Sequence, residues 1–334
     1  MRRIAFLGYY IITTDWAKFA KFVRFVHKES QISLFKLWTY PFVASVKYNI
    51  SLIEYFLFRF WEKNSEERDQ WAGTGFMYEY QKVMNPSPQR ATLLNKAKFL
   101  EHNAPFIKHR WFVVKNGDYN GLKPFLQQID GRVVLKNVVG NCGIGIQAVD
   151  SSADNIEKII ALAKRNHLTL AEEYIVQNKD LMRLSPSGLN TVRIMTQIVE
   201  GSVVLLGARL RISVDSIVDN LAAGNMAALI DEKTGIITQA AVYSDITKQP
   251  AWVHPVTKEK IVGFQVPYWD EVIEKVKVIA LYNQENRSVG WDIAVTDSGV
   301  DFVEGNHDWC KLVYQLPAGK GFKNELLKYV QEFF

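Results

Sequence analysis

The 334-residue sequence contains only two cysteines and no long apolar run, and these absences exclude whole classes of protein. Cys142 and Cys310 cannot build a disulfide framework or a paired metal motif, so we expect a reducing compartment, the cytoplasm. No window reaches the roughly 18 charge-free apolar residues of a membrane span. No segment is repeated or of low complexity, and a hydrophobic content of 48% is typical of a globular chain.

The common phosphate-binding fingerprints are also absent. The stretch VVLKNVVGNCGIGI matches neither the Walker pattern nor the dinucleotide pattern, both of which need a helix directly after the glycines. Residues 144–149 instead alternate like a strand, which predicts a hairpin with the glycine loop at its tip. Backbone N–H groups of such a loop can lie over phosphates, and Lys136 could reach the same phosphates. A glycine-rich hairpin with a surface lysine is the alternative.

The N-terminal part differs in composition from the rest. Residues 1–63 hold ten Lys or Arg against four Asp or Glu, together with 17 of the 42 aromatic residues. The apolar run at 4–12 resembles a signal peptide, but no small-residue cleavage site follows it. Residues 16–28 predict a helix with one basic face and one apolar face, the latter formed by Phe19, Phe22, Val23 and Val26.

This N-terminal part has two possible roles. Basic faces backed by Phe and Trp bind anionic interfaces, so residues 14–62 could lie along the inner face of a membrane. Alternatively, the helices pack over the rest of the protein and expose a solvated basic face. We expect no nucleic-acid partner, because no binding motif is present and the charge excess is small. The oligomeric state is not indicated.

Residues 289–306 bring two carboxylates and an amide together. The runs 291–296 and 300–304 predict a hairpin with the three-residue loop 297–299, which pairs Thr296 with Val300. In that register Asp292 lies opposite Glu304, with Asn306 on the same face. Opposed like charges are destabilising, and a bound divalent cation would remove the penalty. The alternative is a solvated hairpin with scattered acids.

Other charged residues lie in strand-like segments. Glu172 and Glu173 lie within the apolar run 168–176, and buried acids need partners. In the next hairpin, which turns at residues 200–201, Arg193 falls opposite residue 208 or 209. Arginines gathered in this way suit carboxylate or phosphate oxyanions, although they could also extend to water.

In their order along the chain, these features resemble the ATP-grasp superfamily, in particular its sugar-transfer-associated branch. The stretches that carry the resemblance are LSPSGLNTVRIMT, VDNLAAGN, HPVTKEKIVGFQVPYWDEV and VGWDIAV with FVEGN. The resemblance implies an α+β ATP-grasp fold whose two subdomains grip ATP, at about 91–178 and 179–334. A mainly helical, aromatic-rich region, 1–90, would precede it, and a helix over 91–101 would carry Lys96.

The resemblance also implies roles for particular residues. Lys96, Lys136 and the loop would hold the ATP phosphates, with Gly140, Gly143 and Gly145 as the loop glycines. The adenine and ribose contacts would come from Glu172, Glu173, Tyr174, Ile175 and Asp180. The metal ligands of Mg²⁺ would be Asp292, Glu304 and Asn306. Catalysis would depend on Arg193, Lys136 and Arg211, and acceptor binding on Arg209, Arg211, Asp219, Asn220 and Asn225.

The implied reaction joins a carboxylate to an amine. ATP would phosphorylate the carboxylate, and the amine would displace phosphate from the acylphosphate. The hypothesis for the acceptor is a uronic acid of a capsule or exopolysaccharide, joined to an amino acid or another amine. Two alternatives stay open: a sugar kinase of the same fold, and a non-catalytic nucleotide-binding scaffold at the membrane surface.

Overall fold

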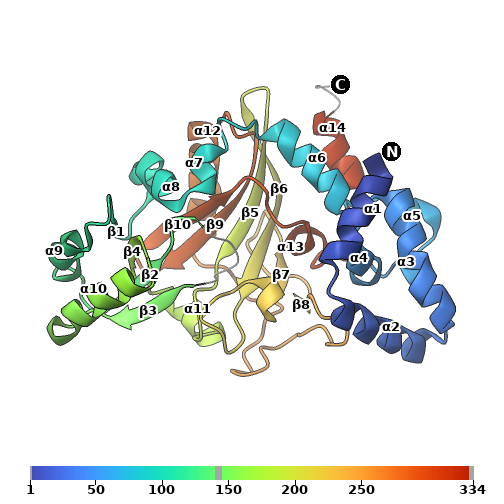
Figure 1. The fold of residues 1–334 in the computed structure, drawn as a ribbon, viewed down its shortest axis with the longest axis horizontal. Coiled ribbons are helices and arrows are strands. Elements are labelled where there is room, and N and C mark those ends of the chain that lie inside the picture. Colours follow the sequence, from blue (N-terminus) through green and yellow to red (C-terminus); the bar gives the residue numbers. More distant parts are fainter. Residues whose placement is uncertain (1, 140–144, 331–334) are drawn as a thin grey trace.

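The computed structural model describes residues 2–139 and 145–330 and places a group of helices beside two antiparallel sheets (Figure 1). The chain begins with helices only. Their bounds are α1 Arg2–Thr13, α2 Trp16–Ser30, α3 Leu34–Tyr48, α4 Leu52–Leu57, α5 Ser65–Asp69 and α6 Thr74–Met84. Within the described ranges, no helix is long and apolar enough to cross a membrane.

Local sequence explains where the first helices begin and end. Asp15 caps α2 by accepting a hydrogen bond from the Lys18 amide, and Gln31 ends it in the left-handed conformation. The predicted apolar face of α2 is confirmed, since Phe19, Phe22, Val23 and Val26 are all buried. They belong to an aromatic core shared with α3 and α4, so the helices stabilise one another.

Side-chain contacts fasten these helices to the rest of the protein. The buried amide of Gln315 accepts a hydrogen bond from the Ala72 N–H and donates one to the Ala72 carbonyl. The Lys311 ammonium lies 2.9 Å from the buried Glu54 carboxylate. Both partners come from α13, Lys311–Gln315, which lies between the N-terminal helices and the second sheet (Figure 1).

The first sheet is small and has the order β1-β4-β2-β3. Its strands are β1 Trp111–Val113, β2 Arg132–Lys136, β3 Gln147–Asp150 and β4 Leu170–Glu173, with helices α9 Leu122–Leu126 and α10 Ile156–Arg165 packed against it. Strands β2 and β3 pair antiparallel, which confirms the predicted hairpin around the glycine loop. Residues 140–144 of that loop lie outside the described residues.

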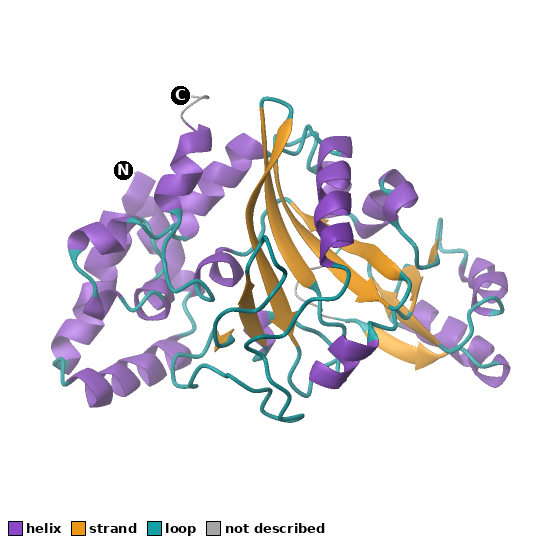
Figure 2. Cartoon of the chain, turned by 180° about the vertical axis from the view of Figure 1, so that it is seen from behind, coloured by secondary structure: helices purple, strands orange, loops and turns teal. Residues whose placement is uncertain are grey.

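The second sheet is larger and has the order β10-β9-β5-β6-β7-β8. Its strands are β5 Val192–Val199, β6 Ser202–Ile212, β7 Met226–Ile230, β8 Val242–Tyr243, β9 Ser288–Thr296 and β10 Gly299–Asn306. The remaining helices are α11 Lys179–Leu184, α12 Trp269–Tyr282 and α14 Lys323–Val330. Helix α12 covers one face of this sheet and shares its main hydrophobic core (Figure 2).

The helix predicted over residues 91–101 is wrong in one respect. Asn95 is extended, with φ −116° and ψ 117°, and divides the segment into α7, Ala91–Leu94, and α8, Lys96–His102. The Asn95 side chain accepts a hydrogen bond from the Lys98 amide, which makes it the N-cap of α8. The break places Lys96 at the first position of a helix.

The predicted fold class is confirmed by these elements: an α+β chain with two sheets, preceded by an aromatic-rich helical region. The boundary at residue 90 and the division near 178 stay predictions.

Candidate functional site

Strands β9 and β10 form the hairpin of the predicted metal ligands, and its turn is shorter than predicted. Gly299 pairs with Thr296, so only Asp297 and Ser298 lie between the strands. Gly299 has a φ of +100°, a conformation that favours glycine. The predicted three-residue loop is therefore wrong. With this turn alone, Asp292 and Glu304 would be one residue out of register and would not face each other.

A β-bulge corrects the register. The pairing shifts between Phe302 and Glu304, where one extra residue enters β10. As a result, Asp292 lies directly opposite Glu304, as predicted, and Asn306 pairs with Gly290. The two carboxylates therefore face each other across the hairpin, and the Asn306 amide nitrogen donates to Asp292 Oδ2 at 3.5 Å.

Asp292 is buried between two arginines. The Arg193 guanidinium donates from Nε and Nη2 to the two carboxylate oxygens, the second at 2.7 Å. Arg211 Nη1 donates to Asp292 Oδ2 at 2.9 Å. Burial by itself would raise the pKa of Asp292, but the charges of Arg193 and Arg211 outweigh it and hold that pKa below its usual range. The protein itself thus neutralises this carboxylate.

Asp219 extends the network on the far side of Arg211. Its Oδ1 lies 2.6 Å from Arg211 Nη2, and its Oδ2 accepts a hydrogen bond of 2.9 Å from the Thr191 amide. Burial raises the pKa of Asp219 despite the opposing charge of Arg211. Arginine and aspartate therefore alternate through the site, in the order Arg193, Asp292, Arg211 and Asp219. The positive charge of an arginine stabilises the ionised form of each aspartate.

Lys136, at the end of β2, belongs to a second buried cluster in the first sheet. Its ammonium forms an ion pair with Oε2 of Glu172 on β4. On the other side of Glu172, His109 Nε2 lies 3.7 Å from Oε1, and His109 Nδ1 lies 2.8 Å from Asp301 Oδ2 on β10. The Glu172 side chain thus links the two sheets through charged groups, and the predicted contact of this segment with adenine stays a prediction.

Lys96 connects the phosphate residues to the metal residues. Its backbone N–H donates to the Val138 carbonyl at 2.8 Å, in the loop that follows Lys136. Its ammonium lies 3.6 Å from the Glu304 carboxylate. The structure therefore places the two predicted lysines and the predicted metal ligands around one region between the sheets.

The donor atoms of the hairpin fit a magnesium ion. Asp292, Glu304 and Asn306 supply carboxylate and amide oxygens, the ligands that Mg²⁺ takes. Glu304 is the more accessible acid, because its side chain is 30% exposed while both oxygens of Asp292 are bonded to arginine. Across the described part of the chain, no group of three or more His, Cys, Asp and Glu residues could hold a metal ion. A site here would therefore need the Asn306 amide and phosphate oxygens of a bound nucleotide.

The other residues of the predicted adenine and ribose site lie along β4 and after it. Glu173 binds Arg110 through both carboxylate oxygens, each at 3.1 Å. The Tyr174 amide donates to the Arg132 carbonyl. Ile175 is half-buried, and Asp180 lies in the first turn of α11. Their roles toward a base or ribose stay predictions.

Only one glycine of the predicted phosphate loop is described. Gly145 has a φ of +78°, and a Cβ added there would meet no atom of the described residues within 4 Å. The backbone conformation, and not crowding, is therefore what favours glycine at this position. Gly140 and Gly143 lie outside the described residues, so their contact with phosphate stays a prediction.

Three of the predicted acceptor contacts are hydrogen-bonded within the protein. Arg209 pairs with Arg193 in the sheet, but its buried guanidinium donates to the Tyr314 carbonyl at 2.6 and 3.1 Å and to the Ala208 carbonyl. Asn225 is fully buried and ties together the loop 214–220. Asn220 caps a short 3₁₀ turn. These bonds support structural roles, whereas Arg211 and Asp219 lie in the network with Asp292.

Replacing Arg209 with methionine tests whether that role is structural. We expect the free energy of unfolding to fall by about 1–3 kcal/mol, because the carbonyls of Tyr314 and Ala208 lose their buried donor. Denaturant unfolding measures the change, and Arg165→Met, on an exposed residue of α10, is the control. A loss of acceptor affinity in a protein of unchanged stability would contradict the structural role.

Two residues of the site were missed by the sequence reasoning. His109 lies in the link before β1, and Asp301 lies in β10 three residues before Glu304. They are 192 residues apart in sequence, and neither lies in a motif. Only the packing of the segment before β1 against β10 brings them together.

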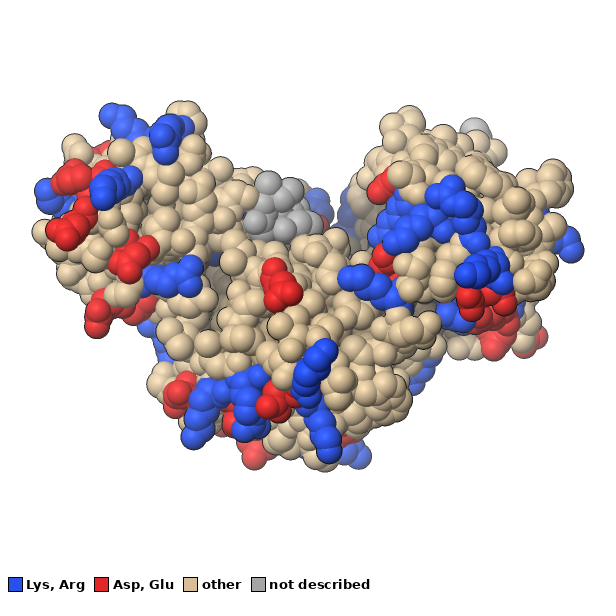
Figure 3. Space-filling view, turned by 90° about the horizontal axis from the view of Figure 1, so that it is seen from below, with Lys and Arg blue, Asp and Glu red and all other residues tan. Residues whose placement is uncertain are grey.

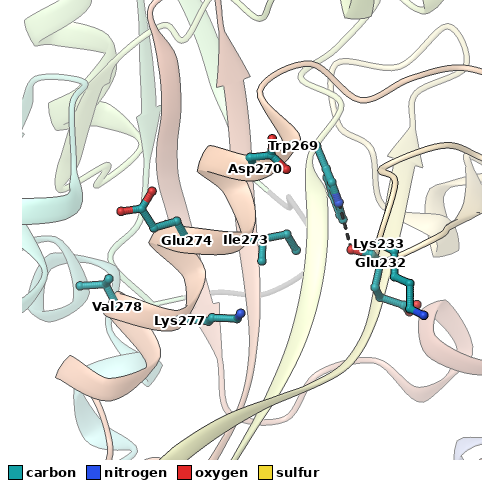
Figure 4. A pocket seen from close by; sticks show the side chains of 8 residues that line it. All are labelled: Glu232, Lys233, Trp269, Asp270, Ile273, Glu274, Lys277 and Val278. Carbon is teal, nitrogen blue, oxygen red and sulfur yellow. Dashed lines mark hydrogen bonds between the residues drawn. The ribbon is translucent and has the colours of Figure 1, made fainter.

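A surface hollow lies away from these residues. It has a volume of about 400 Å³ and lies between α12 and residues 232–233 (Figure 4). The side chains that line it are Glu232, Lys233, Trp269, Asp270, Ile273, Glu274, Lys277 and Val278. None of the predicted site residues is among them, so this hollow is separate from the candidate site.

Comparison with known proteins gives one strong match in sequence. A family model described as sugar-transfer associated ATP-grasp matches residues 76–332. No curated protein matches the chain.

Solved structures resemble the chain more distantly. A structure of the ATP-grasp ligase PsnB complexed with minimal precursor has 13% identity and a TM-score of 0.45, over 75% of this chain and 64% of that chain. D-alanyl-alanine synthetase A from Vibrio cholerae O1 biovar eltor has 11% identity and a TM-score of 0.46, over 73% and 66%. An L-amino acid ligase from Bacillus licheniformis has 11% identity and a TM-score of 0.39, over 71% and 46%. The chain therefore spans less than two thirds of the PsnB chain.

Proposed function

Because the chain belongs to the sugar-transfer associated ATP-grasp family, we propose that it is an ATP-dependent ligase that joins a carboxylate to an amine. Membership of an ATP-grasp family agrees with the predicted cofactors, ATP and Mg²⁺. The observation that carries the proposal is the convergence of Arg193 and Arg211 on Asp292, directly opposite Glu304. This arrangement puts cationic donors for an oxyanion beside oxygen ligands for a metal ion.

In the proposed reaction, ATP phosphorylates a carboxylate and an amine then displaces the phosphate. Mg²⁺, held by Glu304 and Asn306 beside Asp292, would supply positive charge to the phosphates. Lys136 and Lys96 would hold phosphate oxygens from the side of the first sheet. A guanidinium has five N–H donors, and Asp292 uses two of those of Arg193, so the same group can also orient the acceptor carboxylate. Positioning and charge neutralisation would supply the catalysis.

The reaction is tested by an ADP-release screen over pairs of carboxylates and amines. We expect ADP only when ATP, a carboxylate and an amine are all present, and we expect hydroxylamine to capture the activated acyl group. ADP formed with a neutral sugar and no amine would instead support the alternative, a kinase of the same fold. No ADP with any pair, and no loss of cellular product after Asp292→Asn with Glu304→Gln, would support a scaffold.

We propose a uronic-acid sugar of a capsule or exopolysaccharide as the acceptor, joined to an amino acid or another amine. The family description, which refers to sugar transfer, supports a sugar acceptor. The screen should therefore include hexuronic acids together with matched neutral sugars.

We further propose that the protein acts in the cytoplasm and touches an anionic membrane through residues 14–62. The apolar face of α2 takes no part in this contact, because it is buried in the aromatic core. Helix α3 instead exposes Phe35 (77%) and Trp38 (42%), and Trp16 on α2 is also exposed. Basic side chains gather on the N-terminal helices (Figure 3). Arg24 and Lys28 of α2 are exposed, whereas Lys21 forms an ion pair with Asp245. Aromatic residues beside basic ones suit an anionic interface.

Vesicle binding tests the membrane contact. We expect the protein to bind vesicles that contain phosphatidylserine at low salt, and to bind less at high salt because ions screen the attraction. The pair Phe35→Ser with Trp38→Ser should abolish binding, whereas Val278→Ser, an exposed apolar residue of α12, should leave it unchanged. A protein that ignores these vesicles at low salt has no such surface.

A further inference from the structure

His109 lies at the junction of the two sheets. Its ring Nδ1 lies 2.8 Å from Asp301 Oδ2 on β10, and its backbone N–H donates to the same oxygen at 3.0 Å. The Lys108 N–H donates to the other oxygen of Asp301 at 2.8 Å. An ionised carboxylate only accepts hydrogen bonds, so Nδ1 is the donor and carries a proton. Asp301 thereby fixes both the position and the orientation of the ring.

The second ring nitrogen faces Glu172 across the gap between the sheets. Nε2 lies 3.7 Å from Glu172 Oε1, which is buried and has no hydrogen-bond partner among residues 2–139 and 145–330. The other oxygen of Glu172 is bound by Lys136. Glu172 is 5% exposed, so water cannot readily complete the bonding of Oε1. Lys136 therefore binds Oε2 of Glu172, and Oε1 of the same carboxylate faces His109.

The charges of the cluster balance only when His109 is protonated. Lys136 and His109 then face Glu172 and Asp301, while Glu173, beside Glu172 on β4, is bound by Arg110. Burial would lower the pKa of His109, but Asp301 and Glu172 raise it to about 9. Burial would raise the pKa of Glu172, but Lys136 and His109 hold it at about 2. At neutral pH the cluster holds two cations and two anions.

A phosphate that draws Lys136 away would leave Glu172 buried without its present partner. An uncompensated buried charge is strongly unfavourable, so lysine release needs a second cation. His109 is already in place, because a shift of about 1 Å would shorten the Nε2 to Oε1 distance to that of a hydrogen bond. The cluster thus contains both the group to be released and its replacement.

We propose that His109 is a positioning residue that takes over the carboxylate of Glu172 when a nucleotide phosphate binds Lys136. This inference rests on the proposed function, in which Lys136 holds an ATP phosphate. His109 does not touch the nucleotide in this arrangement. It acts through Glu172, and its bond to Asp301 ties the same exchange to β10, the strand of Glu304 and Asn306.

Nucleotide binding by the full chain tests the exchange without any assumption about the acceptor. The probe is AMPPNP with Mg²⁺, measured by calorimetry. We expect His109→Asn to weaken binding by at least about tenfold, because asparagine carries no positive charge. The control is the same substitution at the exposed His167, His167→Asn. The φ of His167 is 53°, a conformation that asparagine also adopts, so this variant should bind like the wild type.

A double-mutant cycle and a pH series separate positioning from simple structural damage. In a Glu172→Gln background the carboxylate that Lys136 would release is absent and Asp301 keeps the same contacts with or without nucleotide, so His109→Asn should then weaken binding by less than about threefold. For the wild type, binding needs the charged imidazole, so affinity should be constant near pH 7 and fall as pH rises through about 9. The pH series needs no substitution, so it stands even where a variant fails to fold.

The outcomes are distinguishable. Coupling between His109 and Glu172, with the expected pH dependence, supports the exchange. Equal losses from His109→Asn in both backgrounds, or a wild-type affinity that does not change through pH 9, would overturn it and leave the nucleotide site intact. If the wild type binds no AMPPNP at all, the proposed function fails, and this inference fails with it.

Discussion

Replacing Asp292 with asparagine is expected to lower the free energy of unfolding by about 3–5 kcal/mol, the usual cost of removing one partner of a buried ion pair. Asp292 is 5% exposed and binds Arg193 and Arg211, so its loss leaves two buried guanidiniums without their shared anion. Asp219 would then be the remaining aspartate that pairs with Arg211. Denaturant unfolding followed by circular dichroism measures the change.

The matched control for Asp292 is Asp154→Asn, on an exposed residue of the 3₁₀ turn between β3 and α10. We expect it to change stability by no more than about 0.5 kcal/mol. If Asp292→Asn were as stable as this control, Asp292 would not be the anion that holds the two arginines.

Glu304→Gln is expected to show the opposite pattern, a large loss of activity with little loss of stability. The Glu304 side chain is 30% exposed, and its contact with Lys96 is long at 3.6 Å, so removing its charge should change stability by less than about 1 kcal/mol. As a proposed metal ligand, however, it should matter to the reaction. We expect Mg²⁺-dependent ADP formation to fall on the order of 100-fold.

Two measurements complete the Glu304 experiment. Glu274→Gln, on an exposed residue of α12, is the control and should retain activity. A titration with Mg²⁺ should show a higher requirement for the metal in Glu304→Gln than in the control. An unchanged requirement, with an unchanged rate, would remove Glu304 from the metal site.

Short-range features of the fold were predictable from the sequence. The period of the apolar residues located α2 and its buried face, and the positions of glycine and charged residues located the hairpins β5–β6 and β9–β10. Local exceptions were harder to predict. Asn95 divides a helix whose residues otherwise favour continuation, because its side chain stabilises a new N-terminus.

In the hairpin of Asp292 and Glu304, the shorter turn and the bulge have opposite effects on the register. The turn has two residues and not three, which alone would separate Asp292 from Glu304. The bulge after Phe302 adds one residue to β10 and restores the pairing. The sequence pattern did not mark this bulge, because its cost depends on how both faces of β10 pack, against α12 and against the α7–α8 region.

The sequence by itself determined that Asp292 and Glu304 belong to one hairpin, because side chains along paired strands alternate between two faces. It also indicated that these acids need a cation. Only the tertiary structure decided that Arg193 and Arg211 already supply positive charge to Asp292. The reason is distance along the chain: Arg193 lies 99 residues before Asp292, and the pairing of β5 with β9 makes the two residues direct neighbours. Pairing between distant strands is fixed by packing of the whole sheet, which no local pattern encodes.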